Sequence, residues 1–292
     1  MDTRALQRTL FRCQADEAFA ARLLAGDEEA WATTDLGPEE RALFADLDPA
    51  ALSADPGGKR RTQILGNVAS EYTTSLAALA HEGRADVLER FLESEEFHGA
   101  LRRDGRLPLA FGDYLERRAR EEGRADRGAL VRLERGLATL RREARGATPI
   151  PNPHPPGEDA TTPPTVTDSP PKALRLATTA RLLTLPAGTH ERAQAWRLSL
   201  EGLPAPDPAP APEGAAEEVL LLHAVEDPGP HRLADVRVEL LAPPADRLLS
   251  DPELLASPAA RAAFATAQGA TAADVEAFLG EFVAEGLLEP AG

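Results

Sequence analysis

The sequence predicts an α+β protein that combines an N-terminal all-helical bundle with a C-terminal winged-helix-like module of three or four short strands and three helices. Three observations lead to this prediction. Apolar residues repeat every three to four positions before residue 145, they alternate at every second position after residue 172, and a proline-rich segment separates the two patterns. A chain of 292 residues is long enough for about two domains of ordinary size.

The first 145 residues carry several apolar stripes at the spacing of one buried helix face. Asp86 is an N-cap candidate for the stripe that begins at Val87, and Ser94 followed by Glu95, Glu96 and Phe97 indicates another helix start. We expect the residues from Ile64 to Leu79 to form one central helix. The stripes predict a helical bundle and comprise Leu6, Leu10 and Cys13; Phe19, Leu23 and Leu24; Ile64, Val68, Tyr72, Leu76 and Leu79; Val87, Leu88, Phe91 and Leu92; Phe111, Tyr114 and Leu115; and Leu130, Leu133, Leu137 and Leu140.

The segment from Gly146 to Pro171 contains nine prolines in 26 residues and only two larger apolar residues, Ile150 and Val166. This composition favours an extended spacer, because it offers no side chains from which to build a core. We therefore expect a helical domain at 1–145, a proline-rich linker at 146–171 and a second domain at 172–292. The alternative is a proline-rich loop on the surface of one larger domain.

After this segment the apolar period becomes two, which predicts strands. Helix signals then return, because Ala245 to Leu249 follows a Pro-Pro pair and because Ser257 and Thr271 are N-cap candidates. The prolines from Pro204 to Pro212 are expected in a loop between two strands. The alternating sets are Leu174, Leu176 and Leu182; Trp196, Leu198 and Leu200; Val219, Leu221, His223 and Val225; and Val236, Val238 and Leu240.

The acidic net charge of the chain argues against nucleic acid as a partner. Asp and Glu number 48 against 32 Lys and Arg, a formal net charge of −16, and such a surface repels phosphate backbones. No apolar run approaches the roughly 20 residues of a membrane helix, and charged residues interrupt the N-terminus where a signal peptide is apolar. We expect a cytoplasmic protein without nucleic-acid or membrane partners.

Residues that carry chemistry are not arranged in a recognisable pattern. The single cysteine, Cys13, lies on an apolar stripe and cannot by itself hold a structural zinc. Gly57, Gly58 and Lys59 lack the remaining residues of a phosphate loop. We therefore expect no catalytic residues, no metal and no cofactor, and hence no enzyme activity. The histidines are scattered at His81, His98, His154, His190, His223 and His231.

An open strand edge in the C-terminal module is the feature that points to a partner. The candidate edge runs from Val236 to Leu241, and an edge strand accepts an extended peptide by backbone pairing. If the helix from Thr271 to Glu285 flanks this edge, the two form a groove with an apolar floor. The alternative is that the helix buries its whole apolar face in its own core. The residues expected to bind a peptide are Val236, Arg237, Val238, Glu239, Leu240 and Leu241 on the strand, and Val275, Phe278, Leu279 and Phe282 on the helix.

Several segments resemble, in order and spacing, the helical partner proteins of the methanobactin and bufferin type, which accompany multinuclear non-haem iron oxidative enzymes. In the N-terminal half these segments are LQRTLFRCQADEAF, ILGNVASEYTTSLAAL, FLESEEFHGAL and LPLAFGDYLERRAREE. In the C-terminal half they are LRLATTARLLTLP, EEVLLLHAVEDPGPHRLADVRVELLAPPADRLL and TAADVEAFLGEFVAEGLL. The final part also looks like the peptide-recognition element of the pyrroloquinoline-quinone chaperone type. Where the partner family often opens its central helix with Tyr-Arg-Asn-Asn, this chain has Ile64, Leu65, Gly66 and Asn67, of which only Asn67 matches.

The resemblance implies a non-catalytic partner subunit in the biosynthesis of ribosomally synthesised and post-translationally modified peptides (RiPPs). Such a subunit binds the leader of the precursor peptide through a RiPP recognition element in its C-terminal module. It presents the core peptide to a non-haem iron oxidative enzyme, with which it forms a heterodimer and to which the iron belongs. The resemblance places the enzyme-docking surface in the helical domain, around Asn67, Phe91, Phe97 and Leu101.

Two other classes of function compete with this interpretation. A winged-helix-type transcription regulator would explain the C-terminal module, but its presumed recognition helix, TAADVEAFLGEFVAEG, contains no Arg or Lys and four acidic residues. DNA would repel this helix. The other class is an acidic protein–protein adaptor outside peptide biosynthesis.

Overall fold

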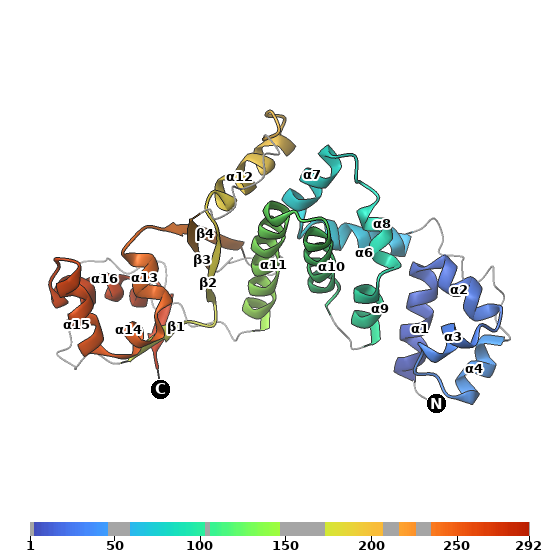
Figure 1. Cartoon of the computed structure of the whole chain (residues 1–292). Helices are drawn as coiled ribbons and strands as arrows, with labels where there is room; N and C mark the ends of the chain where they lie inside the picture. The colour runs from blue at the N-terminus through green and yellow to red at the C-terminus, as the bar shows by residue number, and fades with distance from the viewer. Residues whose placement is uncertain are drawn as a thin grey trace, which may run out of the picture. The chain divides into compact units, whose positions relative to one another are not determined.

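The computed structural model describes residues 3–45, 59–102, 106–146, 173–206, 216–225 and 235–291. The fold is mixed helix and sheet and mostly helical, with helices in the N-terminal part and strands in the C-terminal part, as the sequence predicts (Figure 1). Two compact units comprise Met1–Ala138 with Gly188–Ala215, and Thr139–Ala187 with Ala216–Gly292. Apart from Gly146, the predicted linker lies outside the described residues, and the predicted domain boundaries stay a prediction.

The first unit is helical wherever the structure describes it. Capping side chains start several of these helices: Asp16 accepts from the Phe19 amide at 2.9 Å, and Ser94 accepts from the Phe97 amide at 3.2 Å. The helices are α1 (Thr3–Ala15), α2 (Glu17–Leu24), α3 (Glu28–Ala32), α4 (Pro38–Ala45), α6 (Lys59–Ala69), α7 (Thr73–His81), α8 (Val87–Leu92), α9 (Glu95–Arg102), α10 (Leu107–Glu121), α11 (Ala125–Gly146) and α12 (Thr189–Leu200). The division between the two units falls within α11.

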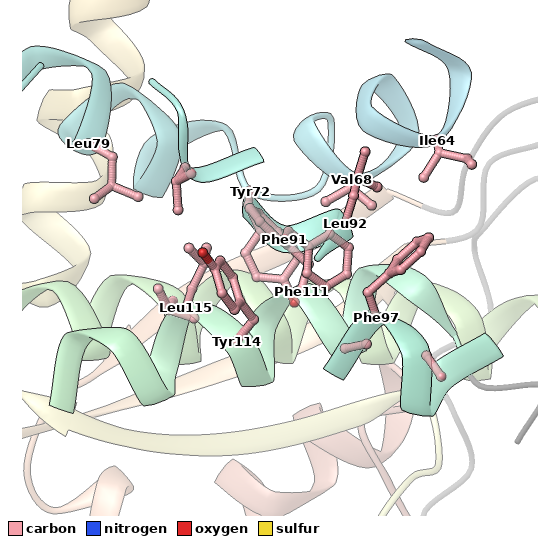
Figure 2. Packing of buried hydrophobic residues seen from close by; sticks show 14 residues of the cluster. Ile64, Val68, Tyr72, Leu79, Phe91, Leu92, Phe97, Phe111, Tyr114 and Leu115 are labelled. Atoms are coloured by element: carbon pink, nitrogen blue, oxygen red, sulfur yellow. The ribbon is translucent and has the colours of Figure 1, made fainter. Parts of the chain in front are cut away.

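Two apolar clusters form the core of this unit. The smaller one joins α1 to α4 around Cys13, Phe19 and Phe44. The larger one joins α6 to α11 and is rich in aromatic rings that meet edge to face, as Figure 2 shows for Phe91 and Phe111, whose ring centroids lie 5.0 Å apart. The buried members of the larger cluster are Ile64, Val68, Tyr72, Leu79, Val87, Phe91, Leu92, Phe97, Ala100, Ala110, Phe111, Tyr114, Leu115 and Val131.

The prediction of one helix from Ile64 to Leu79 is wrong, because the chain breaks between α6 and α7. The new helix has no capping side chain of its own at Tyr72. Instead the carboxylate of Glu134, in α11, accepts hydrogen bonds from the amides of Thr74 at 2.7 Å and Ser75 at 3.0 Å. Burial raises the pKa of Glu134, and the hydrogen bonds from Ser75 and Thr74 oppose this shift. A residue 60 positions away therefore starts α7.

The predicted strand around Trp196 is also wrong, because Thr189–Leu200 forms the helix α12. Its buried residues are Thr189, Ala193 and Trp196, at the spacing of one helix face. Trp196 packs edge to face with His81 of α7 at 5.5 Å between ring centroids. The alternation seen in the sequence ends in two exposed leucines, 198 and 200, so it did not reflect burial.

The second unit contains two small antiparallel sheets followed by helices. Strands β2, β3 and β4 form one sheet in that order, and β1 pairs with β5 in the other. The predicted caps are confirmed, because Ser257 accepts from the Ala260 amide and Thr271 forms a capping box with Asp274. The elements are β1 (Leu174–Leu176), β2 (Ala180–Pro186), β3 (Glu217–Val225), β4 (Asp235–Leu241), α13 (Ala245–Ser250), α14 (Pro252–Ala256), α15 (Pro258–Ala267), α16 (Ala272–Ala284) and β5 (Leu288–Pro290).

The described part of this unit thus has five strands in all, and four helices follow β4. The sequence predicts three or four strands and three helices. The additional helix, α14, begins at Pro252. Asp251 is its N-cap, and the carboxylate of Asp251 accepts a hydrogen bond from the Glu253 amide at 2.9 Å. The helices and the three-stranded sheet share one core, in which Leu221, Leu249 and Leu279 are almost completely buried.

A buried arginine holds three helices of this core together. Arg261 of α15 is only 1% exposed. Its Nε donates to Glu276 of α16 at 2.6 Å, and its Nη1 donates to the carbonyl oxygen of Leu255, in α14, at 2.7 Å. A buried guanidinium needs such partners for its donors, since an unpaired buried charge is strongly destabilising.

Candidate functional site

Strand β4 lies at one edge of the three-stranded sheet, where the sequence places it. It pairs with β3 in antiparallel register, with Val238 opposite Leu222 and Leu240 opposite Leu220. No strand described by the structure lies beyond β4. The backbone on that side of β4 is therefore the place to look for peptide binding.

The register determines which backbone groups of β4 face outward. Hydrogen bonds from the Ala224 amide to Thr179 at 2.9 Å and from the Ala187 amide to Ala216 at 2.7 Å show that the even-numbered residues of β3 bond to β2. The odd-numbered residues of β3 bond to β4, where their partners are Arg237, Glu239 and Leu241.

The N–H and C=O groups of the alternate residues, Val238 and Leu240, therefore point away from β3 toward the open edge. Within the described residues these groups have no backbone partner. The edge thus offers two donors and two acceptors at the spacing of a strand.

The two faces of β4 differ in character. The side chains of Val238 and Leu240 share a face with Leu220 and Leu222, which are completely buried. Leu240 itself is 56% exposed and is the large apolar side chain that β4 shows to solvent. On the opposite face the carboxylate of Glu239 accepts a hydrogen bond from Nε2 of His223 at 3.0 Å.

The predicted groove between β4 and the last helix is only partly realised. The extensive contacts of α16 are with α15 and β5, and those of β4 are with β3. Val275 and Leu279 are buried in the core of the unit, so the alternative that the helix packs on its own core holds for them. Their prediction as peptide contacts is therefore wrong for this conformation. Phe278 and Phe282 are partly buried against the same core, with ring centroids 4.9 Å apart.

The predicted enzyme-docking residues fall into two groups. Phe91 and Phe97 are completely buried in the aromatic core shown in Figure 2, so their side chains are not available to a partner. Asn67 is exposed on α6, and Leu101 is partly buried at the end of α9. Of the four, Asn67 is the exposed residue.

In the part of the chain that the structure describes, no three His, Cys, Asp or Glu side chains gather in a way that could hold a metal ion. None of the described helices is long and apolar enough to cross a membrane. Neither a protein-family model nor a curated protein matches this chain.

Proposed function

We propose that this chain is a non-catalytic partner subunit in RiPP biosynthesis that binds the precursor leader as an additional strand on β4. The observation that carries the proposal is the open edge at Val238 and Leu240, whose outward N–H and C=O groups have no backbone partner among the described residues and can pair with an added strand. Backbone pairing at such an edge provides affinity without demanding a particular peptide sequence. The module is winged-helix-like in this proposal, with the recognition element at its sheet.

Side chains beside the edge would select the leader. A residue of the added strand next to Leu240 gains most by being apolar, because that leucine is 56% exposed and adjoins a buried face. Residues on the other face meet Arg237 and Glu239. The segment 172–292 carries nine Lys and Arg against 18 Asp and Glu, a net charge of −9, so a basic leader binds better and binds more weakly at high salt.

The iron chemistry in this proposal belongs to a separate oxidative enzyme, with which the chain forms a heterodimer in the cytoplasm. The helical unit docks the enzyme, and the surface of α6 around the exposed Asn67 is its best candidate. Because Phe91 and Phe97 are buried, their contribution is to shape that surface from within. The chain needs no metal or cofactor of its own for this role.

A transcription regulator is the second candidate, and the charge of α16 argues against it. Asp274, Glu281 and Glu285 are exposed on or just after this helix, and the segment has no basic residue to offset them. A recognition helix in the DNA groove requires cations near the phosphates. An acidic adaptor with another peptide partner would use the same edge, and the choice of probe separates it from the leader-binding role.

The test uses the leader of a short peptide encoded beside this chain, titrated into the full chain by calorimetry. Val238→Pro removes an N–H that points outward, so it leaves the hydrogen bonds between β3 and β4 in place. We expect about tenfold weaker leader binding, the loss of about 1.4 kcal/mol. Val238→Ala is the matched control, because it shortens the side chain but keeps the N–H.

Equal leader affinity for wild type and Val238→Pro, with the circular dichroism unchanged, would rule out strand addition at this edge. If Val238→Ala weakens leader binding as much as Val238→Pro does, the side chain of Val238, and not its backbone N–H, makes the contact. A chain that binds unrelated basic peptides as tightly as the leader would favour the adaptor.

A further inference from the structure

The first unit contains a cavity of about 920 Å³ that the leader-binding role does not use. It opens between the α1–α2 region and α9, and its size is within the range of about 300 to 1,000 Å³ typical of small-molecule sites. Three arginines line it: Arg12 from α1, Arg22 from α2 and Arg102 from the end of α9. Arg12 and Arg102 also line a smaller neighbouring cavity together with His98.

Two of these guanidinium groups form no ion pair among the described residues, although the carboxylate of Asp16 acts on Arg12 without pairing with it. Arg12 donates from Nη1 to the Thr33 hydroxyl at 2.8 Å and stacks over the Phe19 ring at 3.5 Å, but its buried Nε has no hydrogen-bond partner. Arg102 is exposed and forms no ion pair within the described part of the chain. Arg22 differs, because it pairs with Asp27 at 2.6 Å and with Glu29.

The pKa shifts of Arg12 and His98 reflect burial and the positive charge of the neighbouring arginines on the cavity wall. Burial lowers the pKa of Arg12 to about 10; Asp16 opposes the shift, while Arg102 and Arg22 add to it. Burial, Arg12 and Arg102 lower the pKa of His98 to about 4, so its ring is neutral at pH 7. The ring donates from Nε2 to the Leu92 carbonyl oxygen at 2.9 Å. An anion between the two arginines would relieve their repulsion.

The acidic residues of the lining restrict what that anion can be. Asp16, Glu93 and Glu95 line the same cavity, so its three arginines face three carboxylates. A polyanion such as a nucleoside triphosphate would be repelled by these carboxylates. A ligand with one carboxylate and one ammonium group matches both signs.

We propose that this cavity binds a zwitterion of the amino-acid or short-peptide class, with its carboxylate between Arg12 and Arg102 and its ammonium group toward Glu93 and Glu95. The carboxylate supplies the acceptors that the two guanidinium groups lack. The proposal is independent of leader binding, since the leader site lies in the other unit. A free amino acid and the ends of a peptide share this chemistry, and they differ in length.

The experiment titrates alanine, trialanine and three blocked trialanines into the full chain and follows the ring resonances of His98 by NMR. The blocked forms are acetylated, amidated or both. We expect trialanine or alanine to bind, the amidated forms to lose binding about tenfold or more, and the acetylated form to lose less. The better of alanine and trialanine identifies the length of the ligand. Bound ligand also raises the pKa of His98, because it offsets the charges of Arg12 and Arg102 while Asp16, Glu93 and Glu95 remain.

Arg102→Gln is the first variant, because this exposed side chain has little part in packing, and Arg106→Gln is its control on an exposed arginine outside the cavity lining. We expect about tenfold weaker binding for Arg102→Gln and no change for Arg106→Gln. Arg12→Gln tests the partly buried arginine of the pair, with circular dichroism as the check on folding. Equal binding by the two surface variants, tighter binding of ATP than of trialanine, or no response of His98 to any of these probes would overturn the proposal.

Discussion

Glu134 provides the sharpest test of how the helical unit is built. Glu134 is 5% exposed, and its carboxylate accepts from the amides of Thr74 and Ser75, two of the free donors in the first turn of α7. Glu134→Ala leaves two buried amides without acceptors, at about 1 to 3 kcal/mol each. We therefore expect a loss of about 4 kcal/mol, a large part of the roughly 5 to 15 kcal/mol by which a domain is stable.

The assay is urea unfolding of the full chain followed by circular dichroism, together with hydrogen exchange of the segment Thr73–His81. Glu134→Gln keeps the size of the side chain and one oxygen acceptor, so it should lose about half as much stability as Glu134→Ala. Glu121→Ala is the matched control, since this exposed glutamate pairs with Arg117 on the helix surface and its replacement should cost less than about 0.5 kcal/mol. If Glu134→Ala and the control unfold at the same urea concentration and α7 exchanges as in wild type, the distant cap does not hold α7.

Three further predictions concern other buried side chains, and the first two use the same unfolding assay. Arg261→Met should destabilise the second unit by about 3 kcal/mol, because it removes the donor that hydrogen-bonds to Glu276 and to the Leu255 carbonyl oxygen. An Arg261→Met chain as stable as wild type would contradict this. Because the pKa of His98 in the folded chain is about 4 and lies below its ordinary 6.5, wild type should lose stability relative to His98→Asn as the pH falls from about 6.5 to about 4, by up to about 1.4 kcal/mol per pH unit; a pH-independent difference would contradict the burial of a neutral ring. Burial raises the pKa of Cys13 to about 12, so this single thiol should react with a thiol reagent only as fast as the first unit unfolds, and immediate reaction of the native chain would refute its burial.

The elements that could be predicted from the sequence are those whose signals are local. Ser94, Ser257 and Thr271 cap helices where their residue types predict, because a cap acts on amides two or three residues away. Asp86 precedes α8 as predicted, but its side chain makes no capping hydrogen bond, so that predicted cap is wrong. The break between α6 and α7 could not be predicted in this way, since it depends on Glu134, 60 residues further along the chain. Period-two spacing failed around Trp196 because the helix α12 buries Thr189, Ala193 and Trp196 and leaves the leucines exposed.

The candidate site shows the same limit. Alternation along Val236 to Leu241 predicts a strand, and the order of the elements places it at an edge. Which backbone groups face outward depends on the register with β3 and, through it, with β2, which a single strand does not encode. The burial of Val275 and Leu279 follows from the packing of α16 on α15 and β5, and periodicity alone left that alternative open.

The most direct test of the proposed function is co-expression of the precursor peptide with its iron enzyme, with this chain, with Val238→Pro or with neither form, followed by the mass of the peptide. We predict that the mass change appears with the wild-type chain, is strongly reduced with Val238→Pro and is absent without the chain, because in the proposed role the enzyme receives the peptide through the edge of β4. Full modification of the peptide in the absence of this chain would contradict the account.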